Sequence, residues 1–511
     1  MSVMSMPLPR SARALRLEFK RNAVPYVLPL LAVVFYFDTL RTADGFPPVW
    51  TLRASVIPNH MLIEFSAFAG GLAAWAGSRE GRRKTLDLVA TTPRAAWARL
   101  GAALAGTLCW LLLAFLAGVA VLYVQTALQA TWGGPPLWPV LVGAAGVTVV
   151  TVIGFTCGVL FPGRFTAPLV AIGVLVPFQV GFREAVNVNV TASSGTYALL
   201  SPISVPPPVD TGVYYHVPPD VPIVQVMFMG GIAVALFGVL SLAPGLRQLA
   251  SAGGRPLRVA AVILVACGIA ASWTAFALAG TARPDAVGGW QIPALHSAAS
   301  DQPVPVTPDC TSGSAFQVCV HPAFSFYLDG VAAALDPVAA EIAGLPGAPA
   351  GAREVASMSG GQNAWSGISG NPPVFGFTAE HVGTTYGVFN GIRATMYIES
   401  GIIPDAAAWR EGFQQGLLDS FLIGPSQQAG SVSLDAAQQA VEDALLTAAG
   451  SHPRDPISQM SVNGKPSPGT LAAVSAAARR FAALPASARH AWLAAHLAAL
   501  RAGTITLAQI P

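Results

Sequence analysis

Long apolar stretches separated by short polar ones dominate the first half of the chain. Helices of about 20 apolar residues are long enough to cross a hydrocarbon core of roughly 30 Å. The pattern therefore predicts an α-helical polytopic membrane protein, with six core spans in residues 23–258 and a seventh in residues 259–281. The seven stretches are Val24–Leu40, Met61–Gly77, Leu100–Val124, Pro139–Phe161, Phe165–Phe182, Ile223–Ala243 and Val259–Thr281.

Basic residues divide the connecting segments into two groups. Fifteen Lys and Arg lie in the N-terminal segment and in the loops after the second, fourth and sixth stretches, whereas the opposite loops hold only Arg41, Arg53 and Arg183. Cytoplasmic loops of membrane proteins are enriched in Lys and Arg. We therefore expect a cytoplasmic N-terminus and an extracytoplasmic location for everything after Thr281.

The second half has the composition of a separate domain. Residues 282–309 are rich in Pro, Ala and Ser and are interpreted as a linker. Residues 310–511 are predicted to form a mostly α, α+β extracytoplasmic domain. Apolar spacing predicts helices at Ala323–Ala343, Asp405–Leu422, Leu434–Ala449 and Leu471–Leu500, the last of them broken near Pro485. Ser433 is the N-cap candidate for the helix at Leu434–Ala449, and the residues at Val374–Phe377 suggest a strand or a long loop.

Composition and charge agree with this division. Only 10% of the residues are charged, against about 25% in soluble domains. The net charge of +3 combines a basic first half with an acidic second half, so it indicates two compartments and no nucleic-acid partner. Lys is scarce while Arg, Ala, Gly and Pro abound, which indicates a GC-rich bacterium and hence the bacterial cytoplasmic membrane.

Cys310 and Cys319 lie nine residues apart in the acidic half. A short loop of this kind closes as a disulfide in an oxidising compartment, and we expect that bond here. The alternative is a pair of free thiols.

The N-terminal segment, residues 1–22, interleaves Leu15, Leu17 and Phe19 with basic residues. This pattern is typical of an amphipathic helix that lies in the inner membrane interface. The alternative is a charged segment that only determines the topology.

The basic loop after the second stretch carries the most specific pattern. It contains Thr-Leu-Asp-Leu-Val-Ala-Thr-Thr-Pro at residues 85–93 and Trp-Ala-Arg-Leu at residues 97–100. These residues resemble the permease subunits of actinobacterial type-2 ABC exporters (ABC-2-like). Residues 318–322 and 491–507 resemble permease-like proteins of the same kind that carry an additional C-terminal extracytoplasmic domain of unknown role.

The resemblance implies a partner and a set of site residues. In that family the loop carries a short coupling helix that docks on a separate ATPase subunit, and the permeases work as homodimers or heterodimers. The implied ATPase-coupling loop comprises Arg82, Arg83, Lys84, Thr85, Leu86, Leu88, Val89, Pro93 and Trp97. Two alternatives stay open: a basic loop that reflects topology alone, and a membrane-anchored extracytoplasmic binding or sensor module without transport.

Motifs that would indicate an enzyme are absent from the sequence. There is no P-loop, no His-Glu-x-x-His and no Gly-x-Ser-x-Gly, so we expect no catalytic residue, cofactor or metal, and ATP hydrolysis in another subunit. His321, His381, His490 and His496 are interpreted as surface or capping residues. A hydrolase with an unrecognised or degenerate site is the remaining alternative.

Glu64 is an ionisable residue inside an apolar stretch, where charges are costly and often functional. It is a candidate to contact a cationic or amphipathic cargo or to pair with Arg41 or Arg53. The alternative is a carboxylate that reaches the outer interface.

Overall fold

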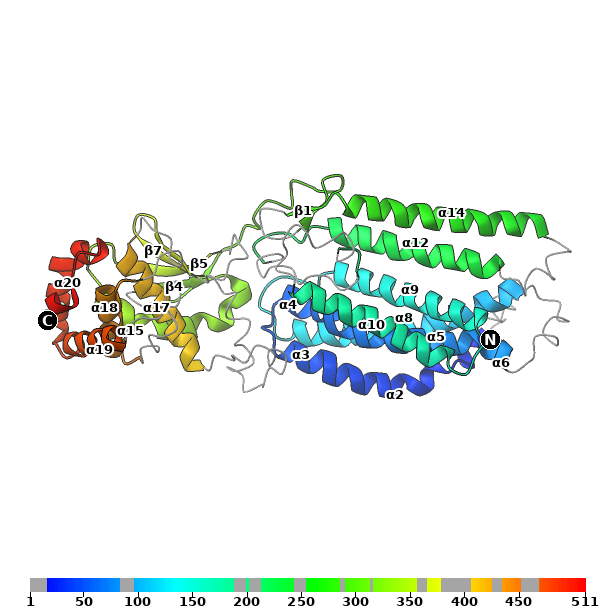
Figure 1. The fold of residues 1–511 in the computed structure, drawn as a ribbon, viewed down its shortest axis with the longest axis horizontal. Coiled ribbons are helices and arrows are strands. Elements are labelled where there is room, and N and C mark those ends of the chain that lie inside the picture. The colour runs from blue at the N-terminus through cyan, green and yellow to red at the C-terminus, as the bar shows by residue number, and fades with distance from the viewer. Residues whose placement is uncertain are drawn as a thin grey trace, which may run out of the picture. The chain divides into compact units, whose positions relative to one another are not determined.

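A computed structural model describes residues 16–82, 96–187, 199–201, 213–242, 254–284, 290–312, 316–355, 365–377, 406–424, 434–451 and 468–511. The chain divides into two compact units (Figure 1). The first comprises Met1–Asp44 and Trp50–Pro303, and the second comprises Gly45–Val49 and Val304–Pro511.

The first unit is a bundle of helices that run side by side (Figure 1). A π-helical segment, η1, continues its first long helix, and a second, η2, precedes α5. A short antiparallel pair of strands, β1 and β2, follows the last helix. The elements are α2 (Val24–Val34), η1 (Phe35–Leu40), α3 (Arg41–Asp44), α4 (Trp50–Ala54), η2 (Ile57–Met61), α5 (Leu62–Gly77), α6 (Arg79–Arg82), α8 (Ala96–Ala127), α9 (Trp138–Leu160), α10 (Thr166–Asn187), α12 (Asp220–Leu242), α14 (Gly254–Ala279), β1 (Arg283–Pro284) and β2 (Trp290–Gln291).

Helices that could cross a membrane are a feature of this unit. Five helices in the described ranges are long and apolar enough to cross a bilayer, and each coincides with one of the seven predicted stretches. The count of six core spans plus a seventh stays a prediction, because α5 has 16 residues and the described apolar part of α10 is Thr166–Val176. The five are Val24–Asp44, Ala98–Ala127, Trp138–Leu160, Asp220–Leu242 and Arg258–Ala279.

Large apolar side chains are exposed on the outward faces of these helices. Water would disfavour such surfaces, whereas lipid accepts them at no cost. Examples are Leu30, Val33, Leu113, Leu116, Val262, Ile269 and Trp273.

Glycines bring pairs of helices into backbone contact. On α9, Gly154 and Gly158 lie directly against the backbone of Gly70 and Ala74 on α5. The same arrangement joins α12 to α14, where a Cβ on Gly231 would lie 2.7 Å from the carbonyl oxygen of Gly268. Small residues at such crossings are how helices associate in lipid. The last span, α14, is therefore packed into the bundle through α12.

The second unit is built on a five-stranded sheet in the order β3-β4-β5-β7-β6. Strands β4, β5 and β7 are parallel, and β3 and β6 pair antiparallel at the two edges. Helix α15 connects β4 to β5 and packs on β4, while α17 packs on β6. The elements are β3 (Asp309–Cys310), β4 (Gln317–Val320), η4 (Pro322–Tyr327), α15 (Leu328–Ile342), β5 (Gly351–Glu354), β6 (Trp365–Ser369), β7 (Val374–Phe377), α17 (Ala406–Ile423), α18 (Ala436–Ala448), α19 (Pro468–Ala482), α20 (Ala486–Arg501) and η9 (Leu507–Gln509).

The helices predicted in this half are present. The predicted break of Leu471–Leu500 near Pro485 is confirmed, because this stretch forms two helices and Pro485 is the N-cap of the second. Ser433 is not the N-cap of α18, because Asp435 takes that position and forms a capping box with Gln438. The amide of Gln438 donates to the Asp435 carboxylate at 2.8 Å and the Gln438 side chain accepts from the Asp435 amide at 2.9 Å, which satisfies two otherwise unpaired groups.

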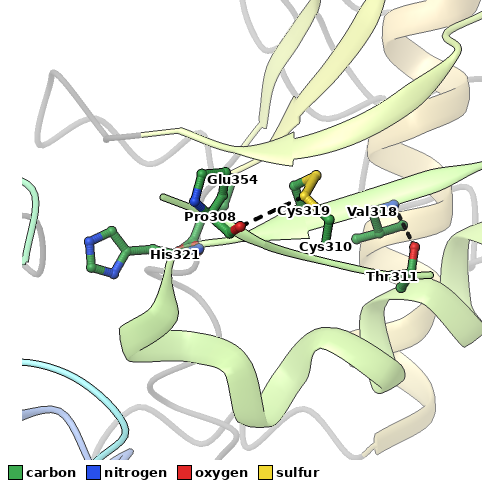
Figure 2. The surroundings of a disulfide bond; sticks show 7 residues. All are labelled: Pro308, Cys310, Thr311, Val318, Cys319, His321 and Glu354. Atoms are coloured by element: carbon green, nitrogen blue, oxygen red, sulfur yellow. Dashed lines mark hydrogen bonds between the residues drawn. A yellow bond between two sulfur atoms is a disulfide. The ribbon is translucent and has the colours of Figure 1, made fainter. Parts of the chain in front are cut away.

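The disulfide between Cys310 and Cys319 is present, so the alternative of free thiols is wrong. The two residues face each other across β3 and β4 with their Cα atoms 4.0 Å apart. The bond therefore closes the edge of the sheet (Figure 2).

Neighbouring glycines of α12 provide a test of the helix contact. Gly231→Ala should destabilise the bundle by about 1–3 kcal/mol, because the added methyl group meets the backbone of α14. Gly230→Ala is the matched control, since nothing lies within 4 Å of a Cβ there. Thermal unfolding in nanodiscs measures both, and equal midpoints for the two variants would contradict the contact.

Candidate functional site

The predicted coupling loop is described at its two ends. Arg82 closes α6 on one side of the loop, and Trp97 lies in the first turn of α8 on the other side. The remaining predicted residues lie outside the described ranges: Arg83, Lys84, Thr85, Leu86, Leu88, Val89 and Pro93.

The N-terminal segment packs against the bundle at this end. Residues 16–20 are helical, and the Glu18 carboxylate accepts two hydrogen bonds from Arg79, at 3.0 and 3.1 Å. The ring of Phe19 stacks on Trp110 with 4.3 Å between centroids, and the indole of Trp110 donates to the Phe19 carbonyl at 2.8 Å. The segment is thus attached to both α6 and α8.

Both flanks of the loop are held to neighbouring helices. The guanidinium of Arg82 lies 4.8 Å from the centroid of the Trp75 ring and donates to the Trp75 carbonyl at 2.9 Å. Glu80 and Arg99 lie 3.8 Å apart across the two ends of the loop. Each such ion pair is worth at most about 1 kcal/mol, so together they position the flanks without making them rigid.

Three ionisable side chains lie close together at the end of the bundle away from this loop. Asp38 belongs to η1, His60 to η2 and Glu64 to the first turn of α5. Asp38 and His60 approach to 3.6 Å, and these two are the charged groups that act on Glu64. Arg53, a candidate partner of Glu64, instead donates to Gln129 at 2.7 Å. Arg41, the other candidate, lies 6.0 Å from the Phe37 ring. The structure thus gives Glu64 a histidine and a second acid as neighbours.

The second unit buries a group of acids between α17 and α18. Glu442 is 1% exposed, and burial, with the nearby charges of Asp419 and Asp443, raises its pKa well above the ordinary value. Burial likewise raises the pKa of Asp419 to about 7 and that of Asp443 to about 6. These acids are therefore held largely in their neutral form below about pH 6.

His321 is a capping residue. It directly follows β4, and its Nδ1 accepts a hydrogen bond from the Ala323 amide at 3.1 Å at the start of η4. Its own amide donates to the buried Glu354 carboxylate at 2.6 Å, and its ring points away from the disulfide (Figure 2). Burial lowers the pKa of His321 to about 4, so the imidazole stays neutral and acts as an acceptor.

A third charged group, Asp220, His296 and Asp301, lies where α12 begins and was not predicted from the sequence. Asp220 lies more than seventy residues before His296 and Asp301 along the chain, so no local sequence pattern predicts this group. Within the described ranges, no group of three or more His, Cys, Asp or Glu side chains could hold a metal ion.

Comparison with protein families, with curated proteins and with solved structures found no match to this chain. The functional argument therefore depends on the residues themselves.

The buried acids of α18 predict a pH-dependent stability. The fold favours the protonated form of Glu442, so stability contributed by this group falls as pH rises above the ordinary pKa of 4.5. Amide exchange in α18 should be similar in wild type and Glu442→Gln at about pH 5, and at least about tenfold faster in wild type at about pH 8.5.

Glu411→Gln is the control for that measurement, because Glu411 is partly exposed on α17. Comparing variants at one pH cancels the intrinsic pH dependence of exchange. If the ratio of the amide exchange rate in wild type to that in Glu442→Gln stayed constant across pH, it would contradict the burial of an ionisable group.

Proposed function

We propose that this chain is the transmembrane permease subunit of an ABC-type exporter, coupled to a separate ATPase subunit. In this proposal the loop between α6 and α8 docks on the ATPase at the cytoplasmic side. Substrate leaves on the side of the second unit, which is extracytoplasmic. The permease acts as a homodimer or heterodimer.

The observation that carries the proposal is the attachment of both flanks of this loop to different helices. Arg82 is bound to the end of α5 through Trp75, and Glu80 faces Arg99 on α8. A displacement of the loop would therefore reach α5 and α8 together. The N-terminal segment, bound through Glu18 and Trp110, would move with the same two elements.

The packing of α5 supports a path by which a displacement of the loop would reach the rest of the bundle. Helix α5 contacts α9, α10 and α6, and its contact with α9 is backbone to backbone at Gly154 and Gly158. A helix in backbone contact moves with its neighbour as a unit, because there are few side chains between them to rearrange. This path connects the proposed dock to the centre of the bundle.

Co-purification tests the dock. The tagged chain, purified from its native membranes, should bring an ATP-binding subunit with it. A variant with Arg83→Glu, Lys84→Glu and Leu88→Pro should lose that subunit, because it reverses the charge and breaks the predicted docking helix.

Arg164→Glu is the matched control. Arg164 is exposed in the loop between α9 and α10, so this variant changes charge at the same end of the bundle but outside the predicted coupling loop. An ATPase that remains bound to the loop variant would show the dock to be wrong. If no ATPase accompanies wild type, the chain is better explained as a membrane-anchored binding or sensor module.

Cysteine labelling tests the topology. In a background without Cys109, Cys157 and Cys267, Ala340→Cys on the exposed face of α15 should react with an impermeant maleimide in intact cells. Gly163→Cys, between α9 and α10, should react only after the membrane is permeabilised. The reverse pattern would place the second unit in the cytoplasm.

A further inference from the structure

The segment that follows α14 folds back onto the start of α12. Ile292 is fully buried in an apolar cluster with Leu200, Val224, Ala275 and Ala279. A turn follows, in which the amide of His296 donates to the Ile292 carbonyl at 2.9 Å. The chain between α14 and the second unit is therefore ordered against the bundle where the structure describes it.

Asp220 anchors this turn from the first residue of α12. Its carboxylate is 0% exposed, and its Oδ2 accepts from the Ile292 amide at 3.0 Å and lies 3.0 Å from Nδ1 of His296. Nε2 of His296 lies 3.0 Å from Oδ1 of Asp301. We refer to Asp220, His296 and Asp301 as the clasp.

The geometry determines the protonation of the ring. An ionised carboxylate only accepts hydrogen bonds, so when both carboxylates are ionised, an imidazole that bonds to one at each nitrogen carries a proton on both. The side chain of His296 is 11% exposed, that of Asp220 is 0% exposed, and that of Asp301 is 50% exposed. A neutral ring would keep one of these bonds and lose the other, and the exposed Asp301 is the partner that water can replace.

We propose that the clasp is a pH-sensitive latch, closed by protonated His296, which holds residues 290–303 on the end of α12. Protonation joins both carboxylates to the ring, and deprotonation releases the Asp301 side of the turn. The proposal does not depend on transport, because it concerns only the connection between α14 and the second unit.

The surroundings of His296 give the sign of the effect. Hydrogen bonding to Asp301 and Asp220 raises the pKa of His296 above its ordinary 6.5, against the opposing effect of burial. In the part of the chain that the structure describes, Asp220 from α12 and Asp301 from the turn are the charged groups that act on His296. The side chains of Ala275, Ala279 and Leu200, from α14 and residues 199–201, pack around Ile292 of the same turn and carry no charge. Because the pKa of His296 is raised in the folded protein, the latch is fully effective below about pH 6.5. Its effect is lost as the pH rises through the pKa of His296 in the folded protein.

Amide exchange of residues 290–303 in the full chain, in nanodiscs, tests the latch. Protection in wild type relative to His296→Gln at the same pH should be at least about tenfold at about pH 5.5 and should disappear by about pH 9, with a midpoint above 6.5. Asp301→Asn should lower that midpoint, because it removes one of the two charges that favour the imidazolium.

His216→Gln is the matched control, since His216 is exposed in the same unit, and it should behave as wild type. The latch would be overturned if the ratio of amide protection in wild type to that in His296→Gln did not change with pH. It would also be overturned if Asp301→Asn left the midpoint of the pH dependence unchanged. Asp301→Asn keeps the test decisive if His296→Gln fails to fold.

Discussion

The close approach of helix backbones is the constraint on which the membrane unit depends. In lipid there is no hydrophobic gain in pressing two apolar helices together, so association depends on van der Waals packing at short range. Gly154 and Gly158 provide it between α9 and α5, and Gly231 and Gly268 provide it between α12 and α14. Since α9 also packs on α12, these two crossings join into one bundle.

The charges are arranged around this apolar centre. One end of the bundle carries the Arg79, Arg82 and Arg99 side chains, each with an acidic or aromatic partner. The far end carries Asp38, His60 and Glu64 in mutual range. Ionised groups are costly in hydrocarbon, and these positions near helix ends let them meet either water or one another. The proposed dock and the proposed latch both belong to these polar ends.

The second unit uses buried charge differently. Helix α18 is covered nearly all round, yet it carries Glu442 and Asp443 into the interior. Burying an ionised acid without a partner costs far more than burying a neutral one, and the raised pKa values express that cost. In the second unit, therefore, acids that the fold removes from water make its stability depend on pH, and the fold is favoured by their protonation.

Apolar periodicity and length by themselves determined the membrane helices, because a helix that faces lipid must be apolar along its whole length. The same holds for the helices of the second unit and for the disulfide, whose nine-residue spacing is local. What only the tertiary structure decided is which distant residues meet. Asp220 and His296 are brought together by the antiparallel packing of α12 and α14, and Glu18 and Arg79 by the packing of the N-terminal segment on the bundle. No local pattern encodes such pairs, since their geometry arises from contacts between helices rather than from spacing along one of them.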